Sequence, residues 1–190
     1  MRLADKIMQY GFDRSRGAWF DKIDSRDLSR HGNRVIWWIQ AYGNMLHMTL
    51  YRCTGNRRYI DDFQKGAQFW NSYLLDKEHG DTYLSVDLEG RIVDGTKANR
   101  FKASYHNMEH CFLNYLALEM WLNHNPVQLH YSLTSSQQDD KLYPILLEDP
   151  SIHIGRVTIN GKEWNTIDRR TSFISLPRQN NLHVVTSMSR

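Results

Sequence analysis

Four stretches of the chain carry apolar residues at the spacing of one helical face. They are residues 1–11, 35–52, 57–75 and 105–123. Apolar side chains three and four positions apart line one side of an α-helix, so each stretch predicts a helix with a buried face. The turn sequence Thr54-Gly55-Asn56 separates the second predicted helix from the third.

A polar segment with short strand signals precedes two of these helices, and the two segments match one another. Residues 13–17 (Asp-Arg-Ser-Arg-Gly) correspond to residues 76–80 (Asp-Lys-Glu-His-Gly), an offset of 63 positions (76 minus 13). The same offset aligns Phe20 with Tyr83, Ile23 with Val86, and Asp24 with Asp87. The chain therefore repeats a unit of helix, short hairpin and helix, which cannot bury its apolar face alone. Such units close into an α/α toroid or stack into an open solenoid.

The pattern changes after the sequence Asn123-His-Asn-Pro126. Apolar and polar residues alternate from Val127 to Leu133, as in a half-buried strand. Asn160-Gly161 between two short strand runs is typical of a tight β-hairpin, and residues 173–176 and 182–186 predict two more strands. We therefore expect a mainly α chain with two domains, a helical domain at residues 1–123 and a small antiparallel β-module at residues 126–190.

The first turns of the helices at residues 35–52 and 105–123 collect aromatic, amide and imidazole side chains. Inner helices of a toroid run parallel, so their N-termini gather at one opening, where unpaired amides suit hydroxyls and developing oxyanions. Histidine is the side chain whose ordinary pKa, about 6.5, suits proton transfer at neutral pH. We predict that this opening binds a carbohydrate and that His106 acts there as an acid or base.

Composition narrows the classes of partner. The net charge is +3 with basic residues scattered along the chain, so no basic stripe predicts nucleic-acid binding. No apolar run approaches the roughly 18 residues of a membrane span, and residues 1–6 lack the apolar core of a secretion signal, so we expect a cytoplasmic protein without membrane contact. Six Trp and ten Tyr serve core packing or sugar stacking. Cys53 and Cys111 have apolar neighbours and are expected to be buried free thiols.

Two other chemistries compete with proton transfer by His106 alone. His106 and His110 are four residues apart and could share a metal ion on one helical face. No further cluster of ligand residues stands out, so we expect no metal site. Asp94 and Glu109 are the nearby carboxylates that a glycoside hydrolase or lyase on the same scaffold would need as a pair.

Four motifs carry a family resemblance. In order they are Trp37-Trp38-Ile-Gln40-Ala41, Leu50-Tyr51-Arg-Cys-Thr54-Gly55 with Tyr59, Asp76-Lys-Glu-His-Gly80, and Lys102-Ala-Ser-Tyr105-His106-Asn107. Over residues 1–123 the chain resembles the N-acylglucosamine 2-epimerase family, which includes the cellobiose 2-epimerases and the mannose isomerases. The resemblance implies an (α/α)6 barrel, with residues 1–123 as its C-terminal portion. It also implies cofactor-independent epimerisation or isomerisation of a mono- or disaccharide.

The resemblance also implies residue roles. In the family mechanism one histidine removes the proton beside the carbonyl of the opened sugar, a cis-enediolate forms, and a second histidine returns the proton. His106 would be one of this pair. The substrate-binding residues expected from the motifs are Trp37, Trp38, Gln40, Phe101, Lys102, Tyr105 and Asn107.

The chain departs from the family pattern at three positions. Tyr42 stands where the family usually has Glu, Phe101 where it often has Trp, and Glu109 where it usually has Arg. Six helix pairs also need more residues than this chain has, and the other family histidine lies on an earlier helix. We therefore expect a fragment of an epimerase that lacks the second histidine and self-associates through an exposed helical edge. The alternatives are a natural short protein and a non-catalytic carbohydrate-binding or scaffold homologue.

Overall fold

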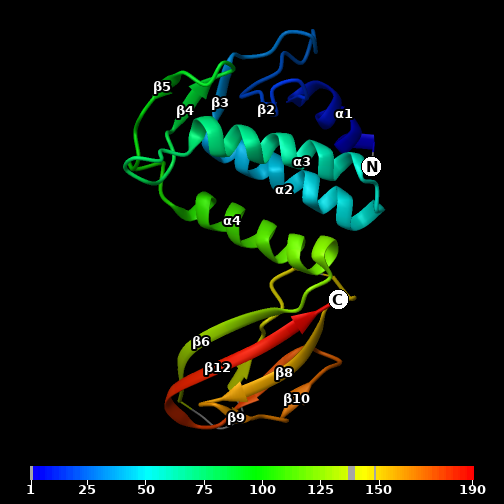
Figure 1. Ribbon diagram of the computed structural model, residues 1–190, viewed down its shortest axis with the longest axis vertical. Coiled ribbons are helices and arrows are strands. Elements are labelled where there is room, and N and C mark those ends of the chain that lie inside the picture. The colour runs from blue at the N-terminus through cyan, green and yellow to red at the C-terminus, as the bar shows by residue number, and fades with distance from the viewer. Residues whose placement is uncertain (1, 137–139, 148) are drawn as a thin grey trace. The chain divides into compact units, whose positions relative to one another are not determined.

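The computed structural model describes residues 2–136, 140–147 and 149–190, and Met1, the first residue of the first predicted helix, lies outside them (Figure 1). The chain divides into two units, Met1–Asn114 and Tyr115–Arg190. Each unit has apolar clusters of its own. Among the described residues, none of the helices is long and apolar enough to span a membrane.

The predicted helices are present, with small changes at their ends. They are α1 (Arg2–Gly11), α2 (Trp37–Thr54), α3 (Arg58–Phe69) and α4 (Tyr105–Ala117). Two π-helical segments, η1 (Trp70–Leu74) and η2 (Leu118–Asn123), continue α3 and α4 to almost the predicted ends. Gly55 ends α2 in the left-handed region, with φ of 69°, and its N–H donates to the carbonyl of Tyr51.

The 63-residue repeat is confirmed in the backbone hydrogen bonds. Asp13 Oδ1 accepts from the N–H groups two and three positions on, and Asp76 Oδ1 does the same. Gly17 and Gly80 close these turns with φ of 78° and 73°, a region that glycine enters without steric cost. Strands β1 (Phe12–Asp13) and β2 (Ala18–Trp19) pair in the first copy, and the bridge Leu75–Thr82 repeats that pairing in the second.

Each polar segment contains a short antiparallel strand pair, as the repeat predicts, and the two segments also pair with one another. β3 (Arg34–Ile36) from the first segment pairs antiparallel with β4 (Ser85–Asp87) from the second, and β4 pairs with β5 (Ile92–Asp94). The pairing buries Val35 and Val86 completely in one apolar cluster, which also contains Trp37. It therefore joins the start of α2 to the second repeat, where the Trp37 N–H donates to the Leu84 carbonyl at 3.1 Å.

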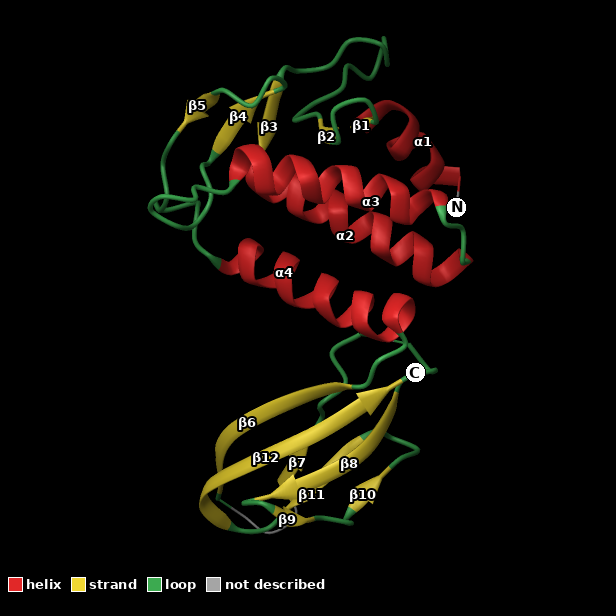
Figure 2. Ribbon diagram, viewed as in Figure 1, coloured by secondary structure: helices red, strands yellow, loops and turns green. Residues whose placement is uncertain are grey.

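The second unit contains two antiparallel sheets (Figure 2). The four-stranded sheet has the order β6 (Val127–Ser135), β12 (Gln179–Ser189), β8 (His153–Ile159) and β9 (Lys162–Glu163). The three-stranded sheet has the order β10 (Ile167–Asp168), β11 (Phe173–Leu176) and β7 (Asp140–Leu142). Buried apolar residues of both sheets form one cluster. Asn160 and Gly161 both have positive φ, 51° and 78°, which confirms the tight turn predicted between β8 and β9.

Two expectations need correction. The described residues form four α-helices and twelve strands, so a mainly α chain is not confirmed; the short strands of the first unit and the sheets of the second balance the helices. Cys53 and Cys111 are free thiols, as expected, but both are exposed and not buried.

Candidate active site

A pocket of about 540 Å³ lies in the first unit, where the predicted opening was placed. Its lining residues come from β3, the first two turns of α2, the residue before β4, the loop after β5 and the first turn of α4. They are Ile36, Trp37, Trp38, Tyr42, Leu84, Asn99, Phe101 and His106. The structure therefore brings together four of the predicted site residues: Trp37, Trp38, Phe101 and His106.

The helix starts meet at this pocket. α2 begins at Trp37 and α4 at Tyr105, and both first turns contribute to the lining. In Figure 1 these two helices begin at the same end of the first unit, beside the loop that follows β5. The geometry that the repeat suggested, with successive helices starting at a shared rim, is present for this pair.

Aromatic rings form most of the wall. Trp37 is buried, whereas Trp38 is 42% exposed and Phe101 is 78% exposed, so two ring surfaces are accessible to a ligand. Asn99 shapes the loop that carries Phe101, because its Oδ1 accepts hydrogen bonds from the N–H groups of Phe101 and Lys102 at 2.7 and 2.8 Å. Such a wall suits the C–H faces of a sugar ring, which pack on aromatic surfaces.

His106 lies among these rings. Its imidazole centroid is 6.1 Å from that of Trp37, 6.5 Å from that of Trp38 and 5.3 Å from that of Tyr42, with the Tyr42 ring edge-on. The side chain is 29% exposed, and Nδ1 is buried without a hydrogen-bond partner among the described residues. The nearest carboxylate oxygen to Nδ1 is Glu109 Oε2, at 3.8 Å.

Glu109 has a second neighbour in the pocket. The Tyr42 hydroxyl donates a hydrogen bond of 2.9 Å to the same oxygen, Glu109 Oε2. This hydrogen bond, together with burial and the negative charge of Glu109, raises the pKa of the Tyr42 phenol above its ordinary value. Tyr42 and Glu109, two of the positions at which the sequence departs from the family pattern, therefore contact one another beside His106.

Gln40 does not line the pocket. It is fully buried on the opposite side of α2, where its Oε1 accepts from the Trp19 N–H at 2.9 Å. Its Nε2 donates to the carbonyls of Gly17 and Gly66 at 2.8 and 3.0 Å. The side chain of Gln40 thus joins α2 to the β1–β2 turn and to α3, and these bonds satisfy its amide without a ligand.

Lys102, Asn107 and Tyr105 surround the pocket without lining it. The buried Lys102 Nζ donates to the carbonyl of Lys97 at 2.7 Å and lies over the Trp37 ring, 5.6 Å from its centroid. Burial lowers the pKa of Lys102. Asn107 donates to Asp81, which fastens α4 to the polar segment. Tyr105 is exposed and packs edge-on against the His106 ring at 5.1 Å.

The alternative chemistries find less support in the geometry. His110 is buried, accepts a hydrogen bond from Asn44 at 3.1 Å and packs on Trp70, and burial lowers its pKa to about 4. It is therefore engaged away from His106, and no group of three or more His, Cys, Asp or Glu side chains able to hold a metal occurs among the described residues. Asp94 lies outside the pocket lining.

Sequence reasoning did not assign a role to four lining residues: Ile36, Tyr42, Leu84 and Asn99. Tyr42 carried a usable signal, because it stands one helical turn after Trp38 and so shares its face. Asn99 carried a weaker one, an Asx residue three positions before Lys102. Leu84 reaches the pocket only through the pairing of β3 with β4, which the sequence pattern did not reveal.

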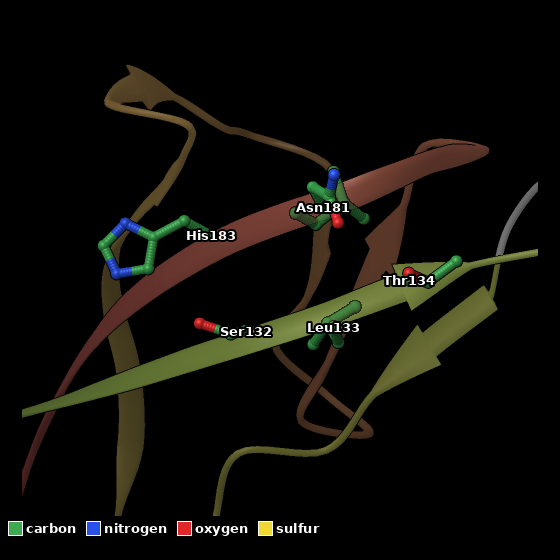
Figure 3. A pocket seen from close by; sticks show the side chains of 6 residues that line it. Ser132, Leu133, Thr134, Asn181 and His183 are labelled. Atoms are coloured by element: carbon green, nitrogen blue, oxygen red, sulfur yellow. The ribbon is translucent and has the colours of Figure 1, made fainter.

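A second pocket of similar volume, about 570 Å³, lies on the sheet of the other unit. Figure 3 shows its lining, in which Ser132, Leu133 and Thr134 come from β6 and Asn181 and His183 from β12. Leu182 completes the lining, which contains no aromatic side chain apart from the imidazole. The first unit therefore offers the better site for a sugar.

Comparison with known proteins supports this assignment of the helical part. The sequence model of the N-acylglucosamine 2-epimerase (GlcNAc 2-epimerase) family matches residues 1–110. No curated protein sequence matches the chain significantly.

Solved structures of sugar epimerases and isomerases share the fold of the matched part. Cellobiose 2-epimerase from Spirochaeta thermophila DSM 6192 aligns with a TM-score of 0.52 and 24% identity over 62% of this chain and 28% of that structure. Cellobiose 2-epimerase from Bacillus thermoamylovorans B4167 aligns with a TM-score of 0.53 and 20% identity over 60% of this chain and 29% of that structure. A D-mannose isomerase aligns with a TM-score of 0.52 and 21% identity over 60% and 28%.

The chain spans less than a third of the length of these structures. The family match, in contrast, extends over more than half of the chain and includes the pocket residues from Ile36 to His106. The chain belongs to the N-acylglucosamine 2-epimerase family.

Proposed function

We propose that the chain is part of a sugar 2-epimerase or aldose–ketose isomerase in which His106 transfers a proton at C2. The observation that carries the proposal is the pocket itself: an imidazole with a partly exposed side chain stands among Trp37, Trp38 and Phe101 at the shared start of two helices. Residues 1–123 would form the C-terminal portion of an (α/α)6 barrel, and residues 126–190 a separate β-module.

The chemistry follows from the placement of a base beside the C2 carbon of an opened sugar. The imidazole takes the proton from C2, the C2–H electron pair forms the C1–C2 double bond, and the carbonyl oxygen becomes the negatively charged oxygen of a cis-enediolate. Return of a proton to the other face of C2, with the C1 carbonyl re-formed, inverts that centre. Return to C1 gives the ketose once the C2 hydroxyl has lost its proton to become the carbonyl and the C1 oxygen has taken one up. Aromatic rings on both sides of the imidazole hold the sugar and exclude water from the intermediate.

A second acid–base group is needed to return the proton on the opposite face. His106 is the histidine in the pocket lining, and His110, one turn further along α4, is buried against Asn44 and Trp70. Since the chain spans less than a third of the related structures, we place the second imidazole in a segment outside these 190 residues. The exposed Tyr105 and Met108 on α4 belong to the edge through which this part would contact the rest of the barrel or another copy.

Deuterium exchange tests the proposal directly. The full-length gene product is incubated with mannose, cellobiose or an N-acylglucosamine in D2O, and the recovered sugar is analysed for deuterium at C2. We expect incorporation with at least one of these sugars, and a loss of at least about 100-fold in His106→Ala, the typical contribution of a positioned acid–base group. His153→Ala, which removes an exposed histidine on β8, is the control and should exchange normally.

The competing function is carbohydrate binding without chemistry. A protein that binds a sugar with unchanged affinity in His106→Ala, but exchanges no deuterium in the unmodified form, would establish that alternative. A carboxylate-based glycoside hydrolase would instead release a monosaccharide from cellobiose and lose that activity in Glu109→Gln.

A further inference from the structure

Two side chains from two helices converge on one carboxylate oxygen of Glu109. Glu109 Oε2 accepts the hydrogen bond of the Tyr42 hydroxyl at 2.9 Å and lies 3.8 Å from His106 Nδ1. Tyr42 comes from the second turn of α2, and the other two residues lie three positions apart on α4, so they share a face of that helix. The ring of Tyr42 also packs edge-on against the imidazole at 5.3 Å.

We propose that Glu109 is a positioning residue that holds the proton of His106 on Nδ1 and thereby leaves Nε2 as the basic nitrogen for the sugar. The inference rests on the proposed function only for its catalytic consequence. The arrangement of Glu109, His106 and Tyr42 stands on the geometry alone.

The unmet hydrogen-bonding requirement of the imidazole Nδ1 supports this role. Nδ1 is buried and has no hydrogen-bond partner among the described residues, and a buried polar atom without a partner costs about 1–3 kcal/mol. The carboxylate of Glu109 accepts hydrogen bonds and cannot donate them when ionised, so it can satisfy Nδ1 only if that nitrogen carries the proton. Catalytic hydrogen bonds are often long in structures without a ligand and shorten when substrate binds, so 3.8 Å is within reach of a direct bond.

Tyr42 gives the carboxylate its orientation. Its hydroxyl occupies one side of Glu109 Oε2, which fixes the side-chain rotamer and directs the carboxylate at the imidazole. The phenol is a donor in this contact, and the raised pKa of Tyr42 keeps it protonated over a wider range of pH. Tyr42→Phe therefore removes the orientation and keeps the ring packing against His106.

Imidazole ¹⁵N spectra of the histidine-labelled full chain, recorded above neutral pH and assigned with His106→Gln, report which nitrogen carries the proton. We expect the proton on Nδ1 in the unmodified protein. In Glu109→Gln the Tyr42 hydroxyl still donates to the side-chain oxygen, so this oxygen stays the atom nearest Nδ1. It is now an uncharged and weaker acceptor, so the form with the proton on Nε2 should appear beside the Nδ1–H form. Tyr42→Phe should give a mixture of the two forms.

The chain supplies a matched control. Glu78 Oε1 lies 3.9 Å from His79 Nε2, a similar separation, but the two side chains are 84% and 71% exposed. Glu78→Gln should leave the tautomer of His79 unchanged, because water competes for both groups. A proton on Nε2 of His106 in the unmodified protein, or the absence of any Nε2–H form in Glu109→Gln, overturns the inference. If Glu109→Gln fails to fold, the spectrum of the unmodified protein decides.

The catalytic consequence has its own readout. In the deuterium-exchange assay, Glu109→Gln should lower kcat by about 10-fold or more with KM changed by less than about twofold, since the residue acts on the imidazole and not on the sugar. If the unmodified protein exchanges no deuterium, the proposed function fails and the tautomer experiment still tests Glu109. If exchange occurs and kcat of Glu109→Gln is normal, the positioning role fails and the proposed function survives.

Discussion

The buried amide of Gln40 allows a sharp test of how α2 is held in place. Gln40→Met keeps the length and helix propensity of the side chain and removes its hydrogen-bonding groups. Three backbone groups then lose their partner: the N–H of Trp19 and the carbonyls of Gly17 and Gly66. At about 1–2 kcal/mol for each buried group left unsatisfied, the first unit should lose about 3–6 kcal/mol of its free energy of unfolding. Total stabilities of domains are typically about 5–15 kcal/mol, so this loss is large.

Urea denaturation followed by tryptophan fluorescence measures the effect on the first unit. With a denaturant slope of about 2 kcal/mol per molar, the expected loss lowers the urea midpoint by roughly 2 M. Gln64→Met makes the same chemical change at an exposed position of α3 and should leave the midpoint within about 0.3 M. The reasoning is refuted if Gln40→Met unfolds at the same urea concentration as the unmodified protein while sugar affinity falls. That result would return Gln40 to the substrate-binding role suggested by its motif.

Two further predictions concern the pocket and the response to acid. Trp38→Ala removes an accessible ring of the wall and should weaken sugar binding by about 10-fold in calorimetric titrations, whereas Tyr73→Ala, a similarly exposed ring outside this pocket, should not. Burial lowers the pKa of His47 to about 3 and that of His110 to about 4, so the unfolded chain takes up these protons first as the pH falls. Stability should be complete above about pH 6.5 and fall by about 2 kcal/mol per histidine between pH 6.5 and 5; an unchanged urea midpoint at pH 5 would contradict this.

The sequence predicts most of the helical unit because its signals are local. The helical period sets α2, α3 and α4 within a few residues, and the match of residues 13–17 with 76–80 corresponds to two equal turns closed by glycines with positive φ. Trp37, Trp38 and His106 were found in the same way, since they occupy the first turns of two predicted helices. The Asn160-Gly161 turn was predictable because both positions require a backbone that few other residues adopt.

The orientation of α2 could not be predicted in the same way. Its apolar residues surround the helix, so the hydrophobic pattern does not separate the core side from the pocket side. The structure shows that Trp37, Gln40 and Asn44 lie on the buried side of α2, whereas Trp38 and Tyr42 lie on the more exposed opposite side. The motif that begins with Trp37 therefore contains one residue that stabilises the fold, Gln40, and two that line the pocket, Trp37 and Trp38.

The contact of Tyr42 with Glu109 and the pairing of β3 with β4 could not be predicted from the sequence either. Each joins positions about 50 or more residues apart, and a single sequence holds no record of which distant residues meet. Both were read only as separate features, two departures from a motif and two hairpins. In the structure, the two departures form one interaction, and β3 of the first polar segment joins β4 and β5 of the second in one sheet, while β1 and β2 pair separately.

The sheet that β3 and β4 share has a consequence for how this site can be inherited or rebuilt. Ile36 and Leu84, on either side of that pairing, both line the pocket, so neither copy of the repeat contains a complete wall. A chimera that exchanges only one copy for that of a relative would have to reproduce the strand register as well as the lining side chains. The smallest transferable unit of this pocket is therefore two successive repeats moved together.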